Sequence, residues 1–401
     1  MVKVNENKEY LISGRIDSSN AANFETELME LISDDAKEIV LSADELEYIS
    51  SAGLRVLMKL CKKYEKVVLK DVSLEVYDIL DMTGFTELLT VKKKLKFIDV
   101  SGLQFIGKGG AGAIYKYTDD SILKTFFDET NDDRIKDILR GSRGAFVKGL
   151  PTAIPFETVM TSEGIGVIYE LIVSDSLAGY LNGNAEDFGE MAHKFADLAK
   201  LLAVTEVDTD TLPNVRTKFI GALDKFAGKI PQEWIDAYEK AVSLVPDSNT
   251  AVHGDFHARN IMLQDKELLL IDMDDFGYGH PIWELAGIYN AYPGFLNSNP
   301  GDERFMQLMG ITTDEGKRLW DIFVADYFDG LSDEDKMTRL KLTAMYGSIR
   351  TANLMGKQIP ADVSQDDPLF QRGLYVIKMV MDNLIIPCLP LAEEAFKTWT
   401  K

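Results

Sequence analysis

The segment HGDFHARN at residues 253–260, followed twelve residues after its final asparagine by Asp272, decides the fold of most of this chain. The intervening residues 261–271, IMLQDKELLLI, predict two short apolar strands joined by the polar turn QDK. Such a hairpin places Asp255 and Asn260 at one end and Asp272 at the exit of its second strand. We therefore expect three oxygen-bearing side chains to converge, a layout that can orient a hydroxyl and hold magnesium against a triphosphate. The alternative is a polar turn beside a buried hairpin.

A glycine-rich motif, GKGGAG at residues 107–112, lies upstream. Its glycines are Gly107, Gly109, Gly110 and Gly112. In a dinucleotide-binding fold the last glycine would open a helix, but the next residues, AIYKY, alternate and favour a strand. Residues 121–126, SILKTF, predict a further strand that carries Lys124. In this order of strand, loop, strand, turn and strand, the glycines let backbone N–H groups approach phosphates.

Together the two motifs resemble the kinase-like fold. The pattern HGDxxxxN, with Gly254 where protein kinases usually carry Arg, is similar to the aminoglycoside phosphotransferase and choline kinase branch. The resemblance implies ATP and Mg²⁺ as cofactors. It implies that Asp255 orients or deprotonates the acceptor hydroxyl and that Asn260 and Asp272 hold the metal. It further implies that Lys124 contacts the α- and β-phosphates.

The N-terminal lobe of that fold ends in a hinge that binds adenine through backbone groups. Residues 152–155 and 159–171 predict further strands, so the resemblance places the hinge at the stretch YELI. Its candidate ATP contacts are Glu170 and Ile172. The following part of the chain has a helical apolar pattern. That pattern consists of Phe188, Met191, Phe195, Leu198 and Leu202.

Two features depart from the protein-kinase pattern. The lysine of that fold pairs with a glutamate on the next helix, but the candidate helix at 132–147 contains no Glu. Asp137 then pairs with the lysine, or it belongs to a solvated helix face. The tripeptide DFG that begins at Asp275 spells the protein-kinase metal motif, yet the apolar strand ends at Asp272, to which we assign the metal. Asp274 and Asp275 remain candidates for substrate contact.

The segment after Asp272 is short. Pro281, a favoured first-turn residue, predicts a helix only nine residues later. A peptide platform of the kind that protein kinases use would not fit, which favours a small-molecule acceptor. Arg259 is expected to contact the transferring phosphate or a neighbouring carboxylate, and His253 to anchor the loop. His257 has no assigned role.

The first hundred residues alternate strands and helices, which predicts a small sheet with helices packed on it. The predicted strands are at 10–16, 38–42, 66–70 and near 97–98. The expected apolar face of the helix that follows the second strand consists of Leu54, Leu57, Met58 and Cys61.

The runs SGRIDSSNA, YISSAGLRVL and DMTGF resemble the STAS domain of anti-sigma-factor antagonists. In that family a Ser or Thr at the start of the helix after the buried strand is the regulatory phosphorylation site. Ser50 and Ser51 stand in this register, although the preceding Asp of the family motif is missing. One of these serines caps the helix, is phosphorylated, or does both.

The amino-acid composition indicates which classes of binding partner and which cellular compartment are expected. The 401 residues carry 43 Lys and Arg against 65 Asp and Glu, a formal net charge of −22, which argues against nucleic acids and anionic membranes. Cys61 and Cys388 lie far apart, so a zinc site or disulfide framework is not expected and reduced cytoplasmic thiols fit. The start of the chain, MVKVNE, is no signal peptide. No unbroken apolar run reaches the ~18 residues of a spanning helix.

We therefore expect an α/β STAS-like domain at 1–100, then an α+β bilobal kinase-like domain with a β-rich N-lobe at 101–172 and a helical C-lobe at 173–401. The predicted function is ATP- and Mg²⁺-dependent phosphoryl transfer to an alcohol, with a small-molecule acceptor and a regulatory STAS domain. One alternative is a protein-directed kinase of a sigma-factor partner-switching pathway, acting on its own STAS serine or on a STAS or anti-sigma partner. The other is a nucleotide-binding pseudokinase scaffold.

Overall fold

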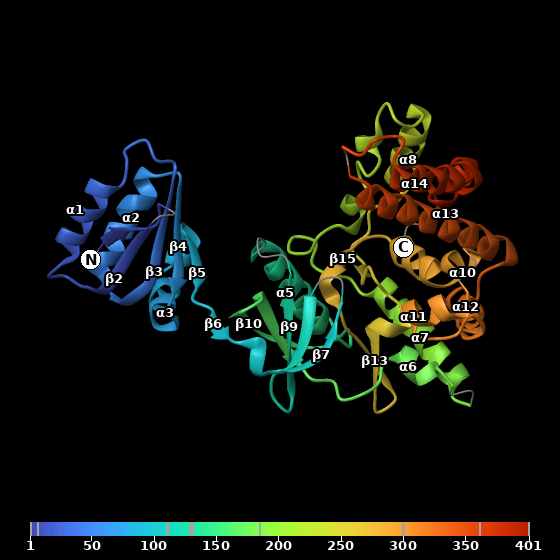
Figure 1. Cartoon of the computed structure of the whole chain (residues 1–401), viewed down its shortest axis with the longest axis horizontal. Coiled ribbons are helices and arrows are strands. Elements are labelled where there is room, and N and C mark those ends of the chain that lie inside the picture. Colours follow the sequence, from blue (N-terminus) through green and yellow to red (C-terminus); the bar gives the residue numbers. More distant parts are fainter. Residues whose placement is uncertain are drawn as a thin grey trace. The chain divides into compact units, whose positions relative to one another are not determined.

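The computed structural model describes residues 2–5, 8–109, 112–127, 132–183, 186–298, 301–360 and 362–399. By internal contacts the chain divides into two units, Met1–Gly102 with Thr158–Gly166, and Leu103–Glu157 with Val167–Lys401. Figure 1 labels the helices and strands of both.

A five-stranded sheet in the order β1-β2-β3-β4-β5 forms the centre of the first unit. Its strands are β1 (Val2–Val4), β2 (Tyr10–Ile16), β3 (Glu38–Ile49), β4 (Lys66–Val72) and β5 (Thr90–Lys93). Its helices are α1 (Ala21–Leu31), α2 (Ser51–Lys63), α3 (Leu74–Met82) and α4 (Phe85–Leu88). β1 is antiparallel to β2, and the other neighbouring strands are parallel. The α/β class and the first three predicted strands are confirmed.

Helix α2 buries one apolar face in the core of this unit. Leu54 and Leu57 are buried as predicted, whereas Met58 is 38% exposed, so its assignment to the buried face is wrong. Val56 and Leu60 are buried instead. Each residue turns the helix by about 100°, so the stripe that contains Leu57 and Leu60 leaves Met58 beside it, toward solvent.

The prediction that residues near 97–98 form the last strand of the first sheet is wrong. β5 pairs in parallel with β4 and packs Val91 against the core of the first unit. β6 (Lys96–Ile98) pairs in parallel with β10 (Pro155–Thr161) in a second sheet. The sequence did not predict β5, because Val91 is the only apolar residue of this strand.

This six-stranded sheet, in the order β6-β10-β11-β9-β8-β7, carries the glycine-rich segment. Its remaining strands are β7 (Gln104–Lys108), β8 (Gly112–Lys116), β9 (Ser121–Phe126) and β11 (Gly164–Glu170). β8 is antiparallel to both β7 and β9, which confirms the predicted order of strand, loop, strand, turn and strand. At Gly112 an added Cβ would lie 1.6 Å from the Thr125 carbonyl oxygen, so only glycine fits between these strands.

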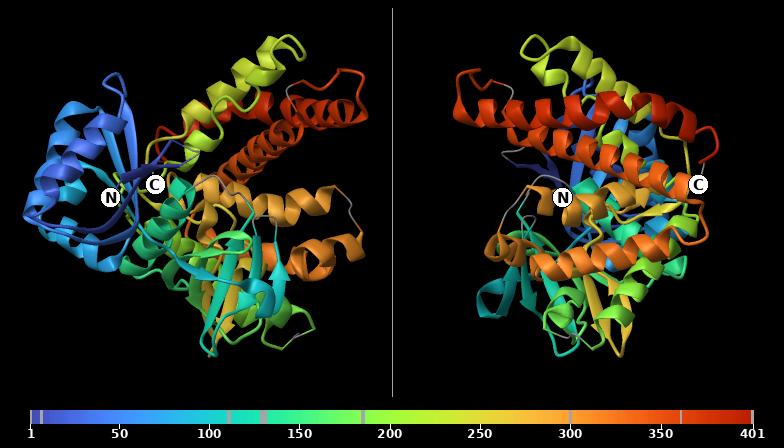
Figure 2. Two further views of the ribbon diagram at one scale, coloured as in Figure 1. Left: turned by 60° about the vertical axis from the view of Figure 1, so that its left-hand side comes forward. Right: turned by 90° about the vertical axis from the view of Figure 1, so that its right-hand side faces the viewer.

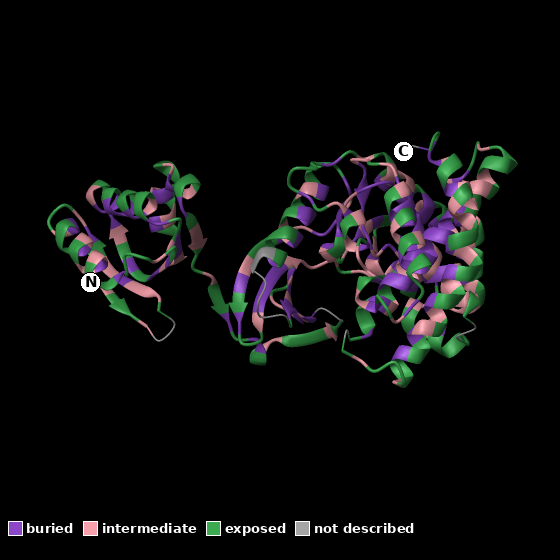
Figure 3. Ribbon diagram, turned by 90° about the horizontal axis from the view of Figure 1, so that it is seen from above, coloured by how far each residue is buried: buried purple, intermediate pink, exposed green. Residues whose placement is uncertain are grey.

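Helices form most of the rest of the second unit. They are α5 (Asp132–Val147), α6 (Leu177–Leu181), α7 (Phe188–Val204), α8 (Gln232–Leu244), α9 (Ile282–Tyr289), α10 (Phe295–Asn297), α11 (Asp302–Met309), α12 (Thr313–Tyr327), α13 (Asp333–Gln358), α14 (Pro368–Val380) and α15 (Ile386–Ala395). All the predicted apolar residues of α7 are buried, and α7 packs against α12. α13 packs against α9 and α14, as Figure 2 shows. In Figure 3 the buried residues of these helices lie on the sides that face one another.

One helical stretch of the described residues, Pro368–Ala395, is apolar and long enough to cross a membrane by length and composition. The criterion of an unbroken apolar run misses it, because Lys378 and Asp382 interrupt the stretch. Phe370 and Ile377 from this stretch belong to the apolar core of the second unit. The same length and composition occur in core helices of soluble proteins, so the stretch alone is weak evidence for a membrane span.

Candidate active site

The hairpin predicted after Asn260 is present. It consists of β13 (Ile261–Gln264) and β14 (Glu267–Leu270), paired antiparallel. The turn residues Asp265 and Lys266 have positive φ angles of 51° and 67°. Two consecutive positive φ angles are typical of the tight turns that join twisted strands in a two-residue hairpin. The local sequence therefore suffices to build this support for the site.

His253 fixes the loop against the end of the hairpin. Its Nε2 donates to the Ile271 carbonyl at 3.0 Å, and its Nδ1 accepts from the Asp255 N–H at 3.3 Å. The side chain is fully buried, so both ring nitrogens are engaged within the protein and His253 is a loop anchor, as predicted. The Ile271 N–H donates to the Asn260 carbonyl at 3.0 Å. The loop is thus tied to the residue that precedes Asp272.

Glu284, on α9, supports the same loop from the other side. Its carboxylate accepts hydrogen bonds from the N–H groups of His253 and, at 3.4 Å, Gly254. Burial raises the pKa of Glu284 despite these hydrogen bonds. Gly254 has a φ of 86°, and a Cβ there would lie 2.8 Å from the Asp275 carbonyl oxygen. This close approach explains the glycine in the HGD motif.

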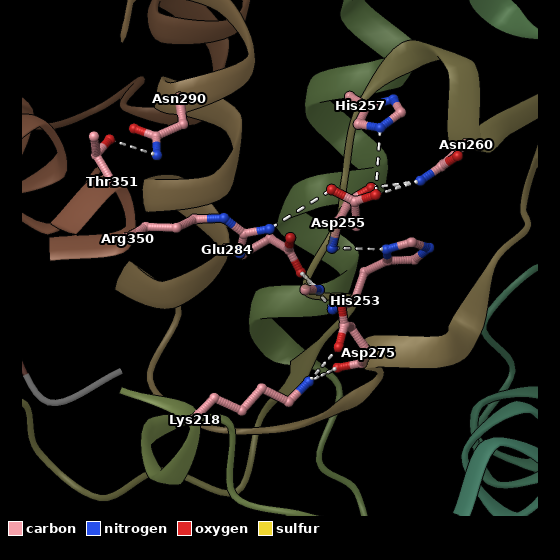
Figure 4. Close-up of polar contacts among 11 residues, drawn as sticks. Lys218, His253, Asp255, His257, Asn260, Asp275, Glu284, Asn290, Arg350 and Thr351 are labelled. Atoms are coloured by element: carbon pink, nitrogen blue, oxygen red, sulfur yellow. Dashed lines mark hydrogen bonds and ion pairs between the residues drawn. The ribbon is translucent and has the colours of Figure 1, made fainter. Parts of the chain in front are cut away.

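Asp255 lies at the centre of a group of polar contacts (Figure 4). Its Oδ2 accepts from Asn260 Nδ2 at 3.0 Å and lies 3.4 Å from His257 Nε2. Its Oδ1 lies 3.6 Å from the Nη2 of Arg350. Burial alone would raise the pKa of Asp255, but the hydrogen bond from His257 and the charges of His257 and Arg350 outweigh it and lower the pKa to about 2. The carboxylate is therefore ionised at neutral pH.

Arg350 reaches this group because α9 and α13 approach closely. A Cβ at Gly347, on α13, would lie 2.5 Å from the Tyr289 Cδ1, so a larger residue would push the helices apart. A Cβ at Gly287, on α9, would lie 3.6 Å from the Arg350 Nη1. Gly347 thus lets the two helices approach, and the Arg350 guanidinium lies against α9 at Gly287.

Lys124 joins the N-lobe sheet to the segment after the hairpin. Its Nζ donates to Asp272 Oδ1 at 2.7 Å and to both carboxylate oxygens of Asp274 at 2.8 Å. Burial would lower the pKa of Lys124, but the two carboxylates outweigh it and raise the pKa. Burial and the negative charge of Asp272 raise the pKa of Asp274, although the positive charge of Lys124 lowers it. The single lysine is shared between two carboxylates and does not compensate for both effects. Asp274, a candidate for substrate contact, pairs with this lysine, and its contact with substrate stays a prediction.

The expectation that Asp137 pairs with Lys124 is wrong. Asp137 forms an exposed ion pair with Arg140 at 2.9 Å, one turn along α5. The alternative prediction, that Asp137 lies on a solvated face of the helix, is confirmed. The acids that pair with Lys124 come from the IDMDD stretch, because that stretch follows β14 directly and has two carboxylates within reach.

Asp275 has a different partner from Asp274, a lysine that the sequence analysis did not identify. Lys218, at the end of the 3-10 helix η2 (Val215–Lys218), donates from Nζ to Asp275 Oδ1 at 2.8 Å and to its carbonyl at 2.9 Å. Burial would raise the pKa of Asp275, but Lys218 and then Arg350 outweigh it and lower the pKa. Figure 4 shows this pair beside the Asp255 loop.

The glycine loop is described in part. Gly110 lies outside the described residues. The Gly109 N–H donates to the Gly112 carbonyl at 2.9 Å, which closes the loop between β7 and β8. A Cβ at Gly107 or Gly109 would meet no atom within 4 Å, so packing does not require glycine at either position. Any constraint on those two glycines comes from what the loop binds.

At the predicted hinge, one of the expected donors is engaged within the protein. The Glu170 N–H donates to the Ile154 carbonyl at 3.1 Å, and the Ile172 carbonyl accepts from the Ser174 N–H at 3.0 Å. An adenine would therefore use the Glu170 carbonyl and the Ile172 N–H. These two contacts stay predictions.

Arg259 does not contact a carboxylate, contrary to one of its expected roles. Its Nη1 donates to the carbonyls of Gln307 at 2.7 Å and Leu308 at 3.2 Å, at the C-terminal end of α11. Carbonyls at a helix C-terminus attract cations. The guanidinium therefore ties the loop to α11. Its contact with the transferring phosphate stays a prediction.

Metal binding was expected at Asn260 and Asp272. Among the described residues, no three or more His, Cys, Asp or Glu side chains are grouped to hold a metal ion. The Asn260 Nδ2 donates to Asp255, which leaves its Oδ1 as an acceptor, and the Oδ1 of Asp272 accepts from Lys124. The Asn260 amide oxygen and the Asp272 carboxylate are a donor set that suits Mg²⁺ when substrate phosphates and water complete it.

In the first unit, Ser50 is the N-cap of α2. Its side chain accepts from the Ala52 N–H at 3.3 Å, which confirms the predicted capping role. Ser51, the first residue of the helix, is exposed. Phosphorylation of either serine stays a prediction.

The sequence missed Arg350 and Lys218 altogether and gave His257 no role. No spacing links the two cations to the HGD motif, because they come from α13 and η2 and meet it only in the folded chain. His257 carried a signal, since it is the second residue after Asp255 in the same short loop. Its Nδ1 is buried without a hydrogen-bond partner among the described residues.

Two family models match the chain. Residues 1–98 match the STAS domain, and residues 184–316 match the phosphotransferase enzyme family, APH. A protein described as the anti-sigma factor antagonist BtrV, from Bordetella bronchiseptica, is 32% identical over 84 residues, which are 20% of this chain and 72% of that protein.

Solved structures are similar to the chain at low identity. Amicoumacin kinase hAmiN, in complex with AMP-PNP, Ca²⁺ and Ami, is 16% identical with a TM-score of 0.48, over 76% of this chain and 94% of that one. A choline/ethanolamine kinase family protein from Mesorhizobium loti is 13% identical with a TM-score of 0.47, over 74% and 95%. ADP-bound aminoglycoside phosphotransferase APH(2'')-Ib is 15% identical with a TM-score of 0.44, over 77% and 96%. The chain belongs to the STAS family through its N-terminal domain, and residues 184–316 of the part that follows match the model of the APH phosphotransferase family.

Proposed function

We propose that the C-terminal domain transfers the γ-phosphoryl group of ATP to a hydroxyl group of a small molecule. The observation that carries this proposal is the position of the Asp255 carboxylate, which lies beside Asn260, His257 and Arg350 at the end of the hairpin of β13 and β14. A preorganised carboxylate beside the reacting groups is what phosphoryl transfer to an alcohol needs.

The pKa of about 2 defines how Asp255 acts. A carboxylate with so low a pKa is a weak base at neutral pH, so its main contribution is to accept a hydrogen bond from the acceptor hydroxyl and orient it. Because the transition state of phosphoryl transfer is loose, placement contributes more than early proton removal. Asn260 holds the carboxylate in position through its Nδ2.

Lys124 and the glycine loop are proposed to place the nucleotide. Lys124 is bonded to Asp272 and Asp274, so it brings its charge to the segment that would hold the metal. Mg²⁺, when bound through Asn260 and Asp272, would neutralise charge on the β- and γ-phosphates. The N–H groups of the loop from Gly107 to Gly112 would approach the same phosphates.

A small-molecule acceptor is favoured by the segment between Asp272 and α9. It contains the 3-10 helix η5 (Met273–Asp275) and the strand β15 (Gly277–Tyr278), which pairs with β12 (Ala251–Val252). α9 then begins at Ile282. All of this segment is used to build the site, so no length remains for a peptide-binding platform.

The second candidate function is phosphorylation of a STAS serine in a sigma-factor partner-switching pathway. It is favoured by the exposed Ser51 at the start of α2 and by the similarity of the first domain to a protein described as an anti-sigma factor antagonist. The acceptor would then be Ser50 or Ser51 of this chain, or a partner STAS or anti-sigma protein. A cytoplasmic location is proposed with either function and fits the two free cysteines, Cys61 and Cys388.

Incubation with γ-labelled ATP, Mg²⁺ and a metabolite mixture separates these functions. The main proposal predicts label in a small molecule and unchanged turnover in Ser50→Ala/Ser51→Ala. Label on the protein that is lost in this double variant would support the second function. Nucleotide binding without any transfer would indicate a pseudokinase scaffold and contradict both.

A further inference from the structure

A second candidate binding site lies on helix α5. A cavity of about 680 Å³ lies between α5 and the segment 207–212, within the second unit. Its basic lining residues are Lys136, Arg140, Arg143 and Lys148. The three that belong to α5 are spaced by four and three residues, so they share one face of the helix. Nothing in the proposed phosphoryl transfer uses this face.

The charge of the cavity is opposite to that of the chain. Four cations meet one acidic residue, Asp208, among the described lining residues, whereas the whole chain has a formal net charge of −22. Arg140 donates to Asp137 and to the Thr211 carbonyl, and Arg143 donates to the Phe156 carbonyl at 3.4 Å. A guanidinium has five N–H donors, so both arginines retain donors for an anion.

The cavity also has an apolar side. Its apolar lining residues are Leu139, Val147, Val207 and Leu212. Gly144 leaves space between them, because a Cβ at this position would meet only the Leu212 Cδ1, at 4.0 Å. A ligand that matches both sides carries a negative group on an apolar body.

We propose that this cavity is a regulatory site for a small amphiphilic anion, with one phosphate, sulfonate or carboxylate group on an apolar body. The anionic group binds Arg140 and Arg143. The apolar body lies over Gly144 against Leu139 and Leu212. Such a ligand contacts both α5 and the segment after α7 and therefore fixes the position of α5.

The opposite face of α5 connects the cavity to the active site. A Cβ at Gly141 would lie 3.5 Å from the Phe276 ring, and α5 contacts η5, which includes Asp274. Asp274 in turn is bonded to Lys124. A ligand that favours one position of α5 changes the affinity for nucleotide, and nucleotide changes the affinity for the ligand by the same factor. This coupling rests on the proposed function, whereas binding in the cavity does not.

The test is a fluorescence titration of the full chain with 1-anilinonaphthalene-8-sulfonate, an apolar sulfonate, with and without saturating ATP and Mg²⁺. Arg140→Ala/Arg143→Ala removes the anion contacts, and Gly144→Phe fills the cavity without removing charge. Arg304→Ala/Arg372→Ala is the matched control, because it removes two exposed arginines from other helices. Circular dichroism shows which variants keep the fold.

Both cavity variants are expected to weaken dye binding by about tenfold, while the control binds like the parent protein. ATP is expected to shift the dye affinity by about threefold without displacing the dye. Equal affinity in all variants, no dye binding, or competitive displacement by ATP would overturn the site. If dye binding follows the prediction but no acceptor is phosphorylated, the cavity stands and the proposed function fails.

Discussion

Arg350 on α13 lies with its Nη2 3.6 Å from the Oδ1 of Asp255, the carboxylate proposed to orient the acceptor. The two residues come from distant parts of the chain and meet because α9 and α13 pack closely. The guanidinium is one of the charges that lower the pKa of Asp255. A residue on a helix of the C-lobe thus adds to the effect of His257 in lowering the pKa of Asp255.

Replacing Arg350 by Met is expected to lower kcat by about tenfold, or about 1.4 kcal/mol in the activation barrier. The pKa of Asp255 rises because a positive neighbour is lost, so the acid limb of the kcat profile moves to higher pH. The KM for ATP stays nearly unchanged, because among the described residues Arg350 forms no ion pair with Lys124 or with its two partners, Asp272 and Asp274. Arg372→Met, at an exposed position of α14, serves as the control. An acid limb at the same pH in both variants would show that Arg350 does not act on Asp255.

Asp274 and Asp137 give a direct comparison of the two candidate partners of Lys124. Asp274→Asn is expected to raise the KM for ATP by about tenfold, because the buried lysine loses one of its two carboxylates. Asp137→Asn is expected to leave KM and kcat unchanged, because its ion pair with Arg140 is exposed. Steady-state kinetics at fixed Mg²⁺ measure both variants. A larger effect for Asp137→Asn would restore the helix pairing that the structure contradicts.

Two glycines of the loop are expected to have different roles: Gly112 is needed for packing and Gly109 for nucleotide binding. Gly112→Ala is expected to destabilise the protein, because its Cβ would overlap the Thr125 carbonyl oxygen. Gly109→Ala is expected to leave the thermal midpoint within about 2 °C of the parent, because its Cβ has open space. The Gly109 variant should still lose ATP affinity, because the added Cβ would occupy the space through which the phosphates approach the loop. Unchanged ATP binding in Gly109→Ala would remove the loop from the nucleotide site.

Stability at low pH reports on Asp255 without any assay of activity. Its pKa in the folded chain is about 2, below the ordinary value of 3.8, so folding favours the ionised form. This contribution is fully present above about pH 4 and is lost as the pH falls to about 2. Asp255→Asn should therefore lose stability against urea relative to the parent at neutral pH, with the difference shrinking over this window. A difference that is the same at pH 2.5 and pH 7 would contradict the lowered pKa.

The parts of the site that the sequence predicted are those that local chemistry builds. The hairpin and the positions of Asp255 and Asn260 follow from a short motif, a polar turn and two apolar strands. The partners of Lys124 could not be found in this way, because Asp272 and Asp274 meet it only when the sheet and the hairpin are both formed.

The same limit applies to the fold. Local sequence patterns predicted β2 and the buried residues of α7, since each pattern lies within one element. The same patterns assigned β6 to the wrong sheet and did not predict β5. The choice of partner strand depends on contacts between residues far apart in the sequence. Met58 was misassigned because apolar character does not by itself tell on which side of a helix stripe a residue lies.

The most direct test of the account compares Asp255→Asn with Asp265→Asn in transfer of the γ-phosphoryl group from labelled ATP to a small-molecule acceptor. Asp265 lies in the turn at the other end of the hairpin, and asparagine tolerates its positive φ of 51°, so this variant changes the same chemical group without touching the site. The account predicts that Asp255→Asn loses about 10²–10⁴-fold in kcat, with ATP binding retained, and that Asp265→Asn transfers phosphate like the parent. Equal transfer by the two variants would contradict the assignment of Asp255 and, with it, the proposed active site.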